Sequence, residues 1–172
     1  MSLKLTPDAP VPALSLPLMG GETFTLNETA PETFTMLVFY RGRHCPVCKT
    51  YLEKLNGLVA GYRDAGFDVV AVSMNTEDLA RKTRQDWDIG AMKLAYGLSE
   101  ADARAWGLWV STAIKEAEAD MFCEPGLAWV RPDGRLYMID ISNMPWARPD
   151  LEFLLSKVPM AVDKGYPARG NV

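Results

Sequence analysis

The sequence predicts an α/β protein in which a mixed central sheet is flanked by helices on both faces and preceded by an N-terminal β-hairpin extension. The unbroken apolar run at residues 36–40 is typical of a strand buried on both faces, and residues 67–75 predict a second buried strand. A helical pattern of apolar residues separates these two segments. A hairpin signal centred on residues 132–134 follows later. Parallel strands joined by helices, followed by an antiparallel hairpin, produce such a mixed sheet.

The composition is that of an ordinary globular protein. The chain has 172 residues, of which 48% are hydrophobic and 23% charged, and this length suits a single domain over residues 1–172. Within it we expect residues 1–32 to form the hairpin extension and residues 159–172 a C-terminal tail. The net charge of −4 argues against nucleic acids and anionic membranes as main partners.

The first residues resemble neither a signal peptide nor a membrane anchor. They lack a long apolar core, and the first prolines fall within the first dozen residues. No run of about 18 apolar residues occurs elsewhere. We therefore expect a cytoplasmic protein. In a reducing cytosol its three cysteines do not indicate a framework of structural disulfides, which leaves redox catalysis, metal binding or packing.

The first half of the chain predicts a hairpin, a strand and a helix. Two alternating stretches around Gly20 and Gly21 form the hairpin within residues 12–26, and the loop 27–32 leads to a strand at 33–40. The helix begins at Pro46, whose N–H would lack a helical partner in any case. Its predicted buried face recurs at three- and four-residue spacing: Val47, Tyr51, Leu55, Leu58 and Tyr62.

The strand at 67–75 precedes a helix capped by Thr76, and a short strand falls within residues 93–98. Ser99, with Asp102 three residues later, predicts the start of another helix.

Residues 107–122 are the least regular, and we expect a loop and a short helix there. The hairpin 126–141 and a closing helix over residues 149–158 complete the chain.

Cys45 and Cys48 form a Cys-x-x-Cys motif where the first buried strand turns into its helix. This placement is typical of a thioredoxin-like redox motif, and we therefore expect a thioredoxin-like fold. The free backbone N–H groups at the helix start favour an anion, and Arg41, Arg43 and a protonated His44 would add positive charge. Both effects would lower the pKa of a cysteine and increase its thiolate fraction.

Other uses of the motif remain open. A zinc site would need ligands beyond the two cysteines and the single histidine, such as carboxylates or Cys123. A structural cysteine pair is a second alternative. The alternative function is therefore a non-catalytic protein of thioredoxin fold that binds a metal or a partner through these cysteines.

Nearly the whole chain resembles the peroxiredoxin-like alkyl hydroperoxide reductase/thiol-specific antioxidant family of the thioredoxin-like superfamily. The stretches that carry the resemblance are APVPALSLPLMGGETFTL, LVFYRGRHCPVC, KLAYGLSEADARAWGL, EPGLAWVRPDGRLY, and SNMPWARPDLEFLL with YPARG. The resemblance implies a thiol-dependent antioxidant oxidoreductase that needs no bound cofactor or metal.

By this resemblance Cys48 holds the position that attacks peroxide, and Cys45 replaces a threonine of the family. Cys45 also matches the attacking cysteine of the thioredoxin motif. Pro125 is similar to the superfamily's cis-proline, which packs against the dithiol. Arg41 and Pro125 stand where the family has a proline and an arginine. The resemblance alone therefore leaves peroxides and substrate disulfides as alternatives.

Both chemistries would leave a Cys45–Cys48 disulfide. In disulfide exchange Cys45 attacks the substrate and Cys48 releases it, whereas in peroxide reduction Cys48 attacks and Cys45 resolves the sulfenic acid. A thioredoxin- or glutathione-type reductant would then restore the dithiol, and the resemblance makes a homodimer a fair expectation.

The sequence also leads to expectations for three further groups of residues. Cys123 is either a small buried side chain or a second resolving thiol. The aromatic residues Trp106, Trp109 and Phe122 are expected to pack together. Met144, Pro145 and Trp146 are candidates for the rim of the site.

Overall fold

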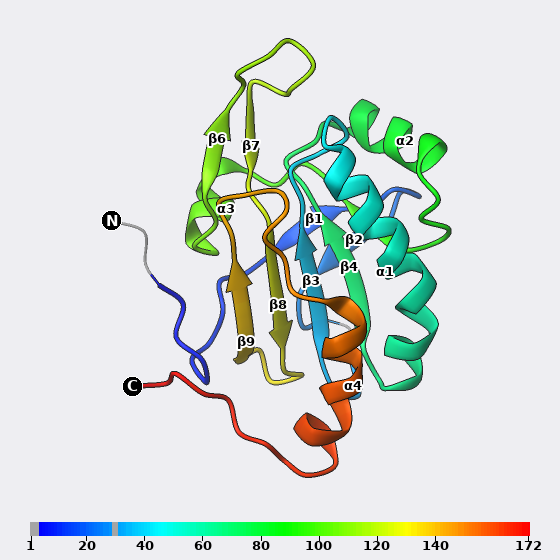
Figure 1. Ribbon diagram of the computed structural model, residues 1–172. Helices are drawn as coiled ribbons and strands as arrows, with labels where there is room; N and C mark the ends of the chain where they lie inside the picture. The colour runs from blue at the N-terminus through cyan, green and yellow to red at the C-terminus, as the bar shows by residue number, and fades with distance from the viewer. Residues whose placement is uncertain (1–3, 29–30) are drawn as a thin grey trace.

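The computed structural model describes residues 4–28 and 31–172 and contains a central five-stranded sheet of order β5-β4-β3-β8-β9 (Figure 1). Residues 29–30 of the expected loop, and residues 1–3 of the expected extension, lie outside the described residues. The sheet strands are β3 (Thr35–Phe39), β4 (Asp68–Val72), β5 (Lys93–Ala95), β8 (Gly126–Val130) and β9 (Leu136–Ile141).

The sheet is mixed, as the sequence predicts. β3 pairs in parallel with β4, and β4 in parallel with β5, whereas β8 is antiparallel to both β3 and β9. Every residue of β3 is buried, because this central strand has neighbours on both edges and packed layers on both faces. The Cys-x-x-Cys motif follows shortly after this strand.

Four helices accompany the sheet in the described chain, and their starts follow local capping chemistry. The Thr76 hydroxyl accepts from the N–H of Leu79 at 3.3 Å, and the Ser99 hydroxyl accepts from the N–H of Asp102 at 3.0 Å. Both caps are predicted by the sequence. The helices are α1 (Pro46–Asp64), α2 (Glu77–Asp86), α3 (Glu100–Ala105) and α4 (Leu151–Val162).

Alternation along β3 divides the core into two parts. Met36 and Val38 face a core that includes Leu52 and Leu55 of α1 and Leu151 of α4. The second core contains residues of β3, of the N-terminal hairpin and of α3: Leu37, Phe39, Leu16, Phe24 and Ala103. Helices α1 and α4 therefore lie on one face of the sheet, and the N-terminal hairpin and α3 lie on the other (Figure 1).

The N-terminal hairpin is present where the sequence predicts it. β1 (Ser15–Pro17) and β2 (Thr23–Thr25) pair antiparallel, with Leu16 opposite Phe24. The N–H of Met19 donates to the carbonyl of Leu94 at 2.9 Å, which fastens the hairpin to the sheet edge.

The expectation for residues 107–122 is wrong. β6 (Val110–Thr112) and β7 (Met121–Cys123) form an antiparallel hairpin instead of a loop with a short helix. Each strand has only three residues, too few to show alternation, and the connection is rich in helix-forming Ala, Glu and Lys. The hairpin projects past the sheet near the start of α1 (Figure 1).

Two smaller expectations also need correction. Trp106 and Phe122 are buried, but the Trp109 side chain is 61% exposed and does not share their packing. Val47 is also exposed rather than on the buried face of α1, because it lies in the first turn, at the helix end.

The chain ends beyond α4 in residues 163–172, which lack a regular helix or strand. Within the described chain no helix combines the length and apolar character needed to span a membrane.

Candidate active site

The two cysteines of the motif lie at the start of α1. Cys45 is the N-cap residue, Pro46 occupies the first helical turn, and Cys48 lies one turn into the helix. The sulfur of Cys45 accepts a hydrogen bond from the Cys48 N–H at 3.3 Å. Both thiols are free, and their residues are 1% and 0% exposed. The helix start thus holds a buried, reduced dithiol.

Gly42 allows the chain to turn from β3 into this helix start. Its φ of +132° lies in a region that L side chains rarely adopt, and a Cβ there would lie 2.6 Å from Asn75 Oδ1. The carbonyl of Gly42 accepts from the Cys45 N–H at 3.1 Å. Residue 42 therefore has to be glycine for Cys45 to reach its capping position.

Arg41 lies beside the sulfur of Cys45. Its positive charge acts on the Cys45 thiol, and its guanidinium lies 4.7 Å from the ring centroid of Phe122. Two carboxylates also pair with it, Glu124 at 3.0 Å and Glu118 at 3.7 Å. Arg41, which the sequence predicts to lie near the dithiol, is therefore part of the surroundings of the dithiol.

These contacts make Cys45 the more acidic thiol. Hydrogen bonds from the Cys48 side chain, the Cys48 N–H and Arg41, together with the charge of Arg41, lower the pKa of Cys45 to about 6, against the opposing effect of burial. At neutral pH this sulfur is largely a thiolate, the nucleophilic form.

A second arginine reaches the other sulfur. Nη2 of Arg148 donates to the sulfur of Cys48 at 2.8 Å. The same side chain is oriented by Nε, which donates to the carbonyl of Pro145 at 2.6 Å, and by the Tyr51 ring, 4.8 Å from the guanidinium carbon. Tyr51 is itself fixed, because its hydroxyl donates to the Pro149 carbonyl at 2.8 Å.

Burial, and the hydrogen bond that Cys48 makes to Cys45, raise the pKa of Cys48, although the charge of Arg148 acts in the opposite direction. The pair consequently carries a single negative charge at neutral pH. This charge lies mainly on Cys45, and each sulfur faces its own guanidinium.

Arg43 and His44, the other two residues expected to add positive charge to the dithiol, have different surroundings. Arg43 forms an ion pair with Asp86 of α2. The imidazole of His44 packs 4.6 Å from the Phe122 ring, and burial, followed by the charge of Arg41, lowers the pKa of His44. His44 is therefore neutral at pH 7 and adds no full positive charge to the dithiol.

Pro125 lines a small cavity beside Arg148, but the prediction that Pro125 is a cis-proline is wrong. No cis peptide bond occurs within residues 4–28 and 31–172, so the Glu124–Pro125 bond is trans. The backbone runs extended from β7 into β8, with Glu124 N–H bonded to the Trp109 carbonyl and the Pro125 carbonyl bonded to Ser142 N–H. An extended path of this kind suits a trans bond.

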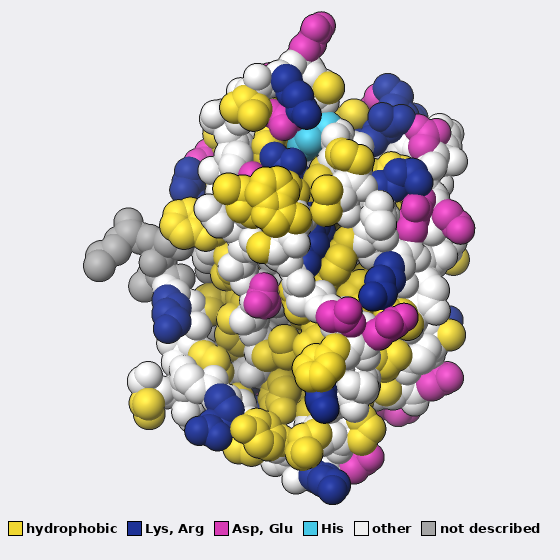
Figure 2. Space-filling view, viewed as in Figure 1, with side chains coloured by type: hydrophobic (Ala, Val, Ile, Leu, Met, Phe, Trp, Pro, Cys, Tyr) yellow, Lys and Arg dark blue, Asp and Glu magenta, His cyan; other side chains and the backbone are white. Residues whose placement is uncertain are grey.

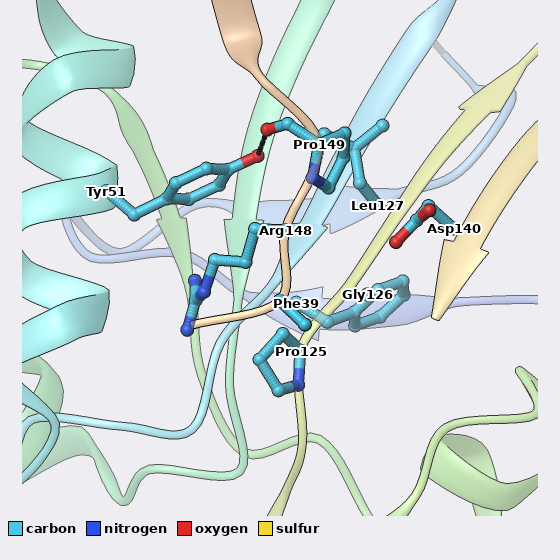
Figure 3. A pocket seen from close by; sticks show the side chains of 9 residues that line it. Phe39, Tyr51, Pro125, Gly126, Leu127, Asp140, Arg148 and Pro149 are labelled. Carbon is cyan, nitrogen blue, oxygen red and sulfur yellow. Dashed lines mark hydrogen bonds between the residues drawn. The ribbon is translucent and has the colours of Figure 1, made fainter. Parts of the chain in front are cut away.

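The cavity itself lies between β3, α1, β8, β9 and the segment at residues 142–150 that joins β9 to α4 (Figure 3). Its volume is about 10 Å³ for the centre of a water-sized molecule, close to what one water molecule needs. Apolar side chains form most of its wall, and Asp140 and Arg148 add charged groups. Arg148 thus both lines the cavity and contacts Cys48.

The segment at residues 142–150 also supplies exposed apolar side chains. Met144 is 41% exposed and Trp146 is 71% exposed. Hydrophobic side chains are exposed on this face of the molecule, among basic and acidic ones (Figure 2).

The third cysteine is deeply buried. Cys123 ends β7, is 0% exposed, and its sulfur lies 3.5 Å from the Tyr40 carbonyl, to which it donates. Burial raises the pKa of Cys123 to about 12, so this thiol stays protonated at neutral pH. It lacks the features that activate Cys45.

Within the described ranges, no group of three or more His, Cys, Asp or Glu side chains is arranged to hold a metal ion. The alternative of a metal site would therefore have to rest on the two sulfurs of the motif without a third protein ligand from those ranges.

Arg148 is the functional residue that sequence reasoning misses. It lies 100 positions from Cys48, in a loop whose only local signals are the flanking prolines at 145 and 149. The prediction that residues 144–146 border the site identifies the right segment without identifying the arginine. No pattern in the sequence connects the two residues.

Several solved structures share this fold at low sequence identity. A peroxiredoxin-like protein from Aquifex aeolicus has 16% identity and a TM-score of 0.73, with 94% of this chain and 90% of that chain covered. Mycobacterium bovis AhpC has 16% identity and a TM-score of 0.74, with 99% of each chain covered. A putative thiol:disulfide interchange protein DsbE from Chlorobium tepidum has 19% identity and a TM-score of 0.68, with 92% and 98% covered.

Among curated proteins, no sequence matches this chain significantly. The model of the AhpC/TSA family matches residues 7–139, which is most of the chain and includes both cysteines of the motif. The protein belongs to the AhpC/TSA family and is a thiol-dependent oxidoreductase of the antioxidant type.

Proposed function

We propose that the protein reduces small peroxides, with Cys48 as the attacking sulfur, Arg148 as its guanidinium partner and Cys45 as the resolving thiol. The observation that carries this proposal is the 2.8 Å hydrogen bond from Arg148 to Cys48. A guanidinium at this place stabilises a thiolate and can donate to a peroxide oxygen as negative charge develops there. Arg148 thereby supplies the guanidinium that is missing at position 125, where the family has an arginine and this chain has Pro125.

The first step is a proton transfer within the dithiol. The resting charge lies mainly on Cys45, whose sulfur accepts a hydrogen bond from the Cys48 N–H at 3.3 Å. When the Cys48 proton moves to Cys45, the charge moves to the sulfur beside Arg148. Both charge positions have a guanidinium partner, so the charge is paired before and after the transfer.

The Cys48 thiolate then attacks one peroxide oxygen, and the O–O bond breaks. The sulfur becomes a sulfenic acid, and the leaving oxygen takes a proton from solvent to give an alcohol or water. The Cys45 thiol next attacks the sulfur of Cys48, which forms the disulfide and releases water. Two thiols of a thioredoxin- or glutathione-type reductant restore the dithiol and are themselves oxidised to a disulfide.

Dithiol–disulfide exchange is a second candidate, favoured by the low pKa of Cys45. A thiolate at a helix start attacks disulfides, and its pKa of about 6 also makes it a good leaving group. In this chemistry Cys45 forms the mixed disulfide, and Cys48 attacks Cys45 to release the reduced substrate. Arg148 would then act only in the second step.

The test mixes fully reduced protein with one equivalent of hydrogen peroxide and follows thiol loss by stopped flow, with peptide mapping of the product. Peroxide reduction predicts fast loss and a Cys45–Cys48 disulfide. Cys48→Ser abolishes the fast phase, whereas Cys45→Ser retains it and accumulates a sulfenic acid. Thiol loss no faster than that of a free cysteine would overturn peroxide reduction and leave disulfide exchange.

The proposal also covers the domain organisation, the location and the assembly of the enzyme. We propose a single domain over residues 1–172 that acts in the cytoplasm, where reductants are abundant, and a homodimer as its assembled form. These are expectations of the sequence, to be measured by fractionation and by sedimentation.

A further inference from the structure

Two acidic residues of the β6–β7 region are buried against Arg41. Glu124 is 4% exposed, and its Oε2 lies 3.0 Å from Nε of Arg41. Glu118 is 9% exposed, and its Oε1 lies 3.7 Å from Nη2 of Arg41. Buried carboxylates are costly unless they are paired, so this arrangement requires an explanation.

Both carboxylates are held by their own hairpin. Oε1 of Glu124 accepts from the Ser111 hydroxyl at 2.8 Å, and Oε2 of Glu118 accepts from the Ile114 N–H at 2.8 Å. Each therefore uses one oxygen for the hairpin and the other for Arg41. The carboxylates cannot turn to solvent without losing a hydrogen bond inside the hairpin.

We infer that Glu124 and Glu118 are positioning residues that share the charge of Arg41 and thereby limit the acidity of Cys45. Arg41 would then stabilise the Cys45 thiolate less than an arginine without carboxylate partners would. The β6–β7 hairpin, which sequence reasoning missed, would set the pH at which the dithiol ionises.

The sign of the effect follows from counting charges. One guanidinium pairs with two carboxylates and also acts on Cys45, so the guanidinium and the two carboxylates together already carry one negative charge. Removing one carboxylate charge leaves more of the guanidinium's field for the thiolate. Among the described residues, the other titratable and charged groups around this site are Tyr40, His44, Cys48, Lys115, Cys123 and, beyond Cys48, Arg148.

The inference deepens the proposed function, since it concerns the same dithiol. It is nevertheless tested without peroxide or a reductant, through the ionisation of Cys45 alone. A failure of peroxide reduction would leave this test unchanged, and a failure of this test would leave the peroxide measurement unchanged.

The experiment measures the rate of Cys45 alkylation by iodoacetamide against pH in the full-length reduced protein, with peptide mapping to isolate Cys45. Glu124→Gln keeps the size of the side chain and its acceptor for Ser111. We expect the midpoint of the profile to fall by about one pH unit, the effect of removing one nearby like charge. Glu116→Gln, in the same hairpin connection and exposed, is the matched control and should leave the midpoint unchanged.

Glu118→Gln provides a second variant with a longer ion pair, and it should shift the midpoint in the same direction by less. Circular dichroism confirms that each variant is folded. An unchanged midpoint in both variants would overturn the inference. An upward shift would also overturn it, because it would mean that the carboxylates increase the acidity of Cys45 by fixing Arg41.

Discussion

Nη2 of Arg148 donates a hydrogen bond of 2.8 Å to the sulfur of Cys48, although the two residues lie 100 positions apart in the chain. The fold creates this contact because the segment between β9 and α4 passes beside the first turns of α1 (Figure 1). The Tyr51 ring and the Pro145 carbonyl hold the guanidinium in place. The site therefore has an arginine at Cys48 that comes from a different part of the chain than the family pattern indicates.

Replacing Arg148 by methionine should slow the reaction of the reduced protein with hydrogen peroxide by about 10- to 100-fold, because a charged donor at the reacting atoms is lost. Arg148→Lys should recover part of the rate, since it keeps the charge but not the two-pronged geometry. Stopped-flow thiol loss measures both. Arg43→Met is the control, because Arg43 pairs with Asp86. Equal rates in the Arg148→Met variant and the wild type would remove Arg148 from the chemistry.

The small cavity beside Arg148 leads to a prediction about peroxide size. Its volume of about 10 Å³ for the centre of a water-sized molecule suits a molecule near the size of water. Hydrogen peroxide should therefore react faster than cumene hydroperoxide, by about tenfold or more. Competition between the two peroxides for a limiting amount of reduced protein gives the ratio directly. A preference for the bulky peroxide would show that substrates approach Cys48 by another path.

The lowered pKa of Cys45 predicts how stability depends on pH. Between pH 7 and 8.5 the folded protein has lost this proton, because its pKa is about 6, whereas the unfolded chain retains it up to a cysteine pKa of about 8.5. The unfolded state then binds more protons, so the free energy of unfolding rises with pH from pH 7 to about 8. At higher pH the raised pKa values of Cys48 and Cys123 reverse the trend, since these two thiols then ionise only in the unfolded chain.

Urea unfolding of the reduced protein at several pH values measures this dependence. The range above pH 7 excludes most of the titration of His44, whose pKa is lowered. Cys45→Ser should remove the rise between pH 7 and about 8 and keep the fall at higher pH. A rise of the same size in Cys45→Ser would assign the dependence to another group.

Local chemistry explains which elements could be predicted from the sequence. The apolar run of β3 and the capping residues Thr76 and Ser99 each contain the information for their own structure within a few residues. The position of Cys45 at the start of α1 is equally local, because Pro46 marks the helix start.

What could not be predicted depends on contacts between distant segments. β6 and β7 are stable as short strands because they pair with each other. The connection between them consists of helix-forming residues, so the local propensity of the connection points to a helix instead of a hairpin. The placement of Arg148 depends on the path of the segment that contains it. Only the folded chain brings this segment to Cys48.

Two glycines provide a matched test of the packing. A Cβ on Gly126, at the start of β8, would lie 2.6 Å from Leu108 Cδ2 and 3.4 Å from Phe39 Cδ2, both in the buried core. Gly126→Ala should therefore lower the free energy of unfolding by about 1–3 kcal/mol through overpacking.

Gly57 is the opposite case, because it is exposed inside α1 and a Cβ there would meet nothing within 4 Å. Gly57→Ala should raise the free energy of unfolding by about 0.5–1 kcal/mol, since alanine loses less backbone entropy in a helix. Urea unfolding of both variants beside the wild type measures the two shifts. Stabilisation by Gly126→Ala would mean that Leu108 moves aside without cost, and that the core between β8 and α3 is looser than the contacts around Gly126 indicate.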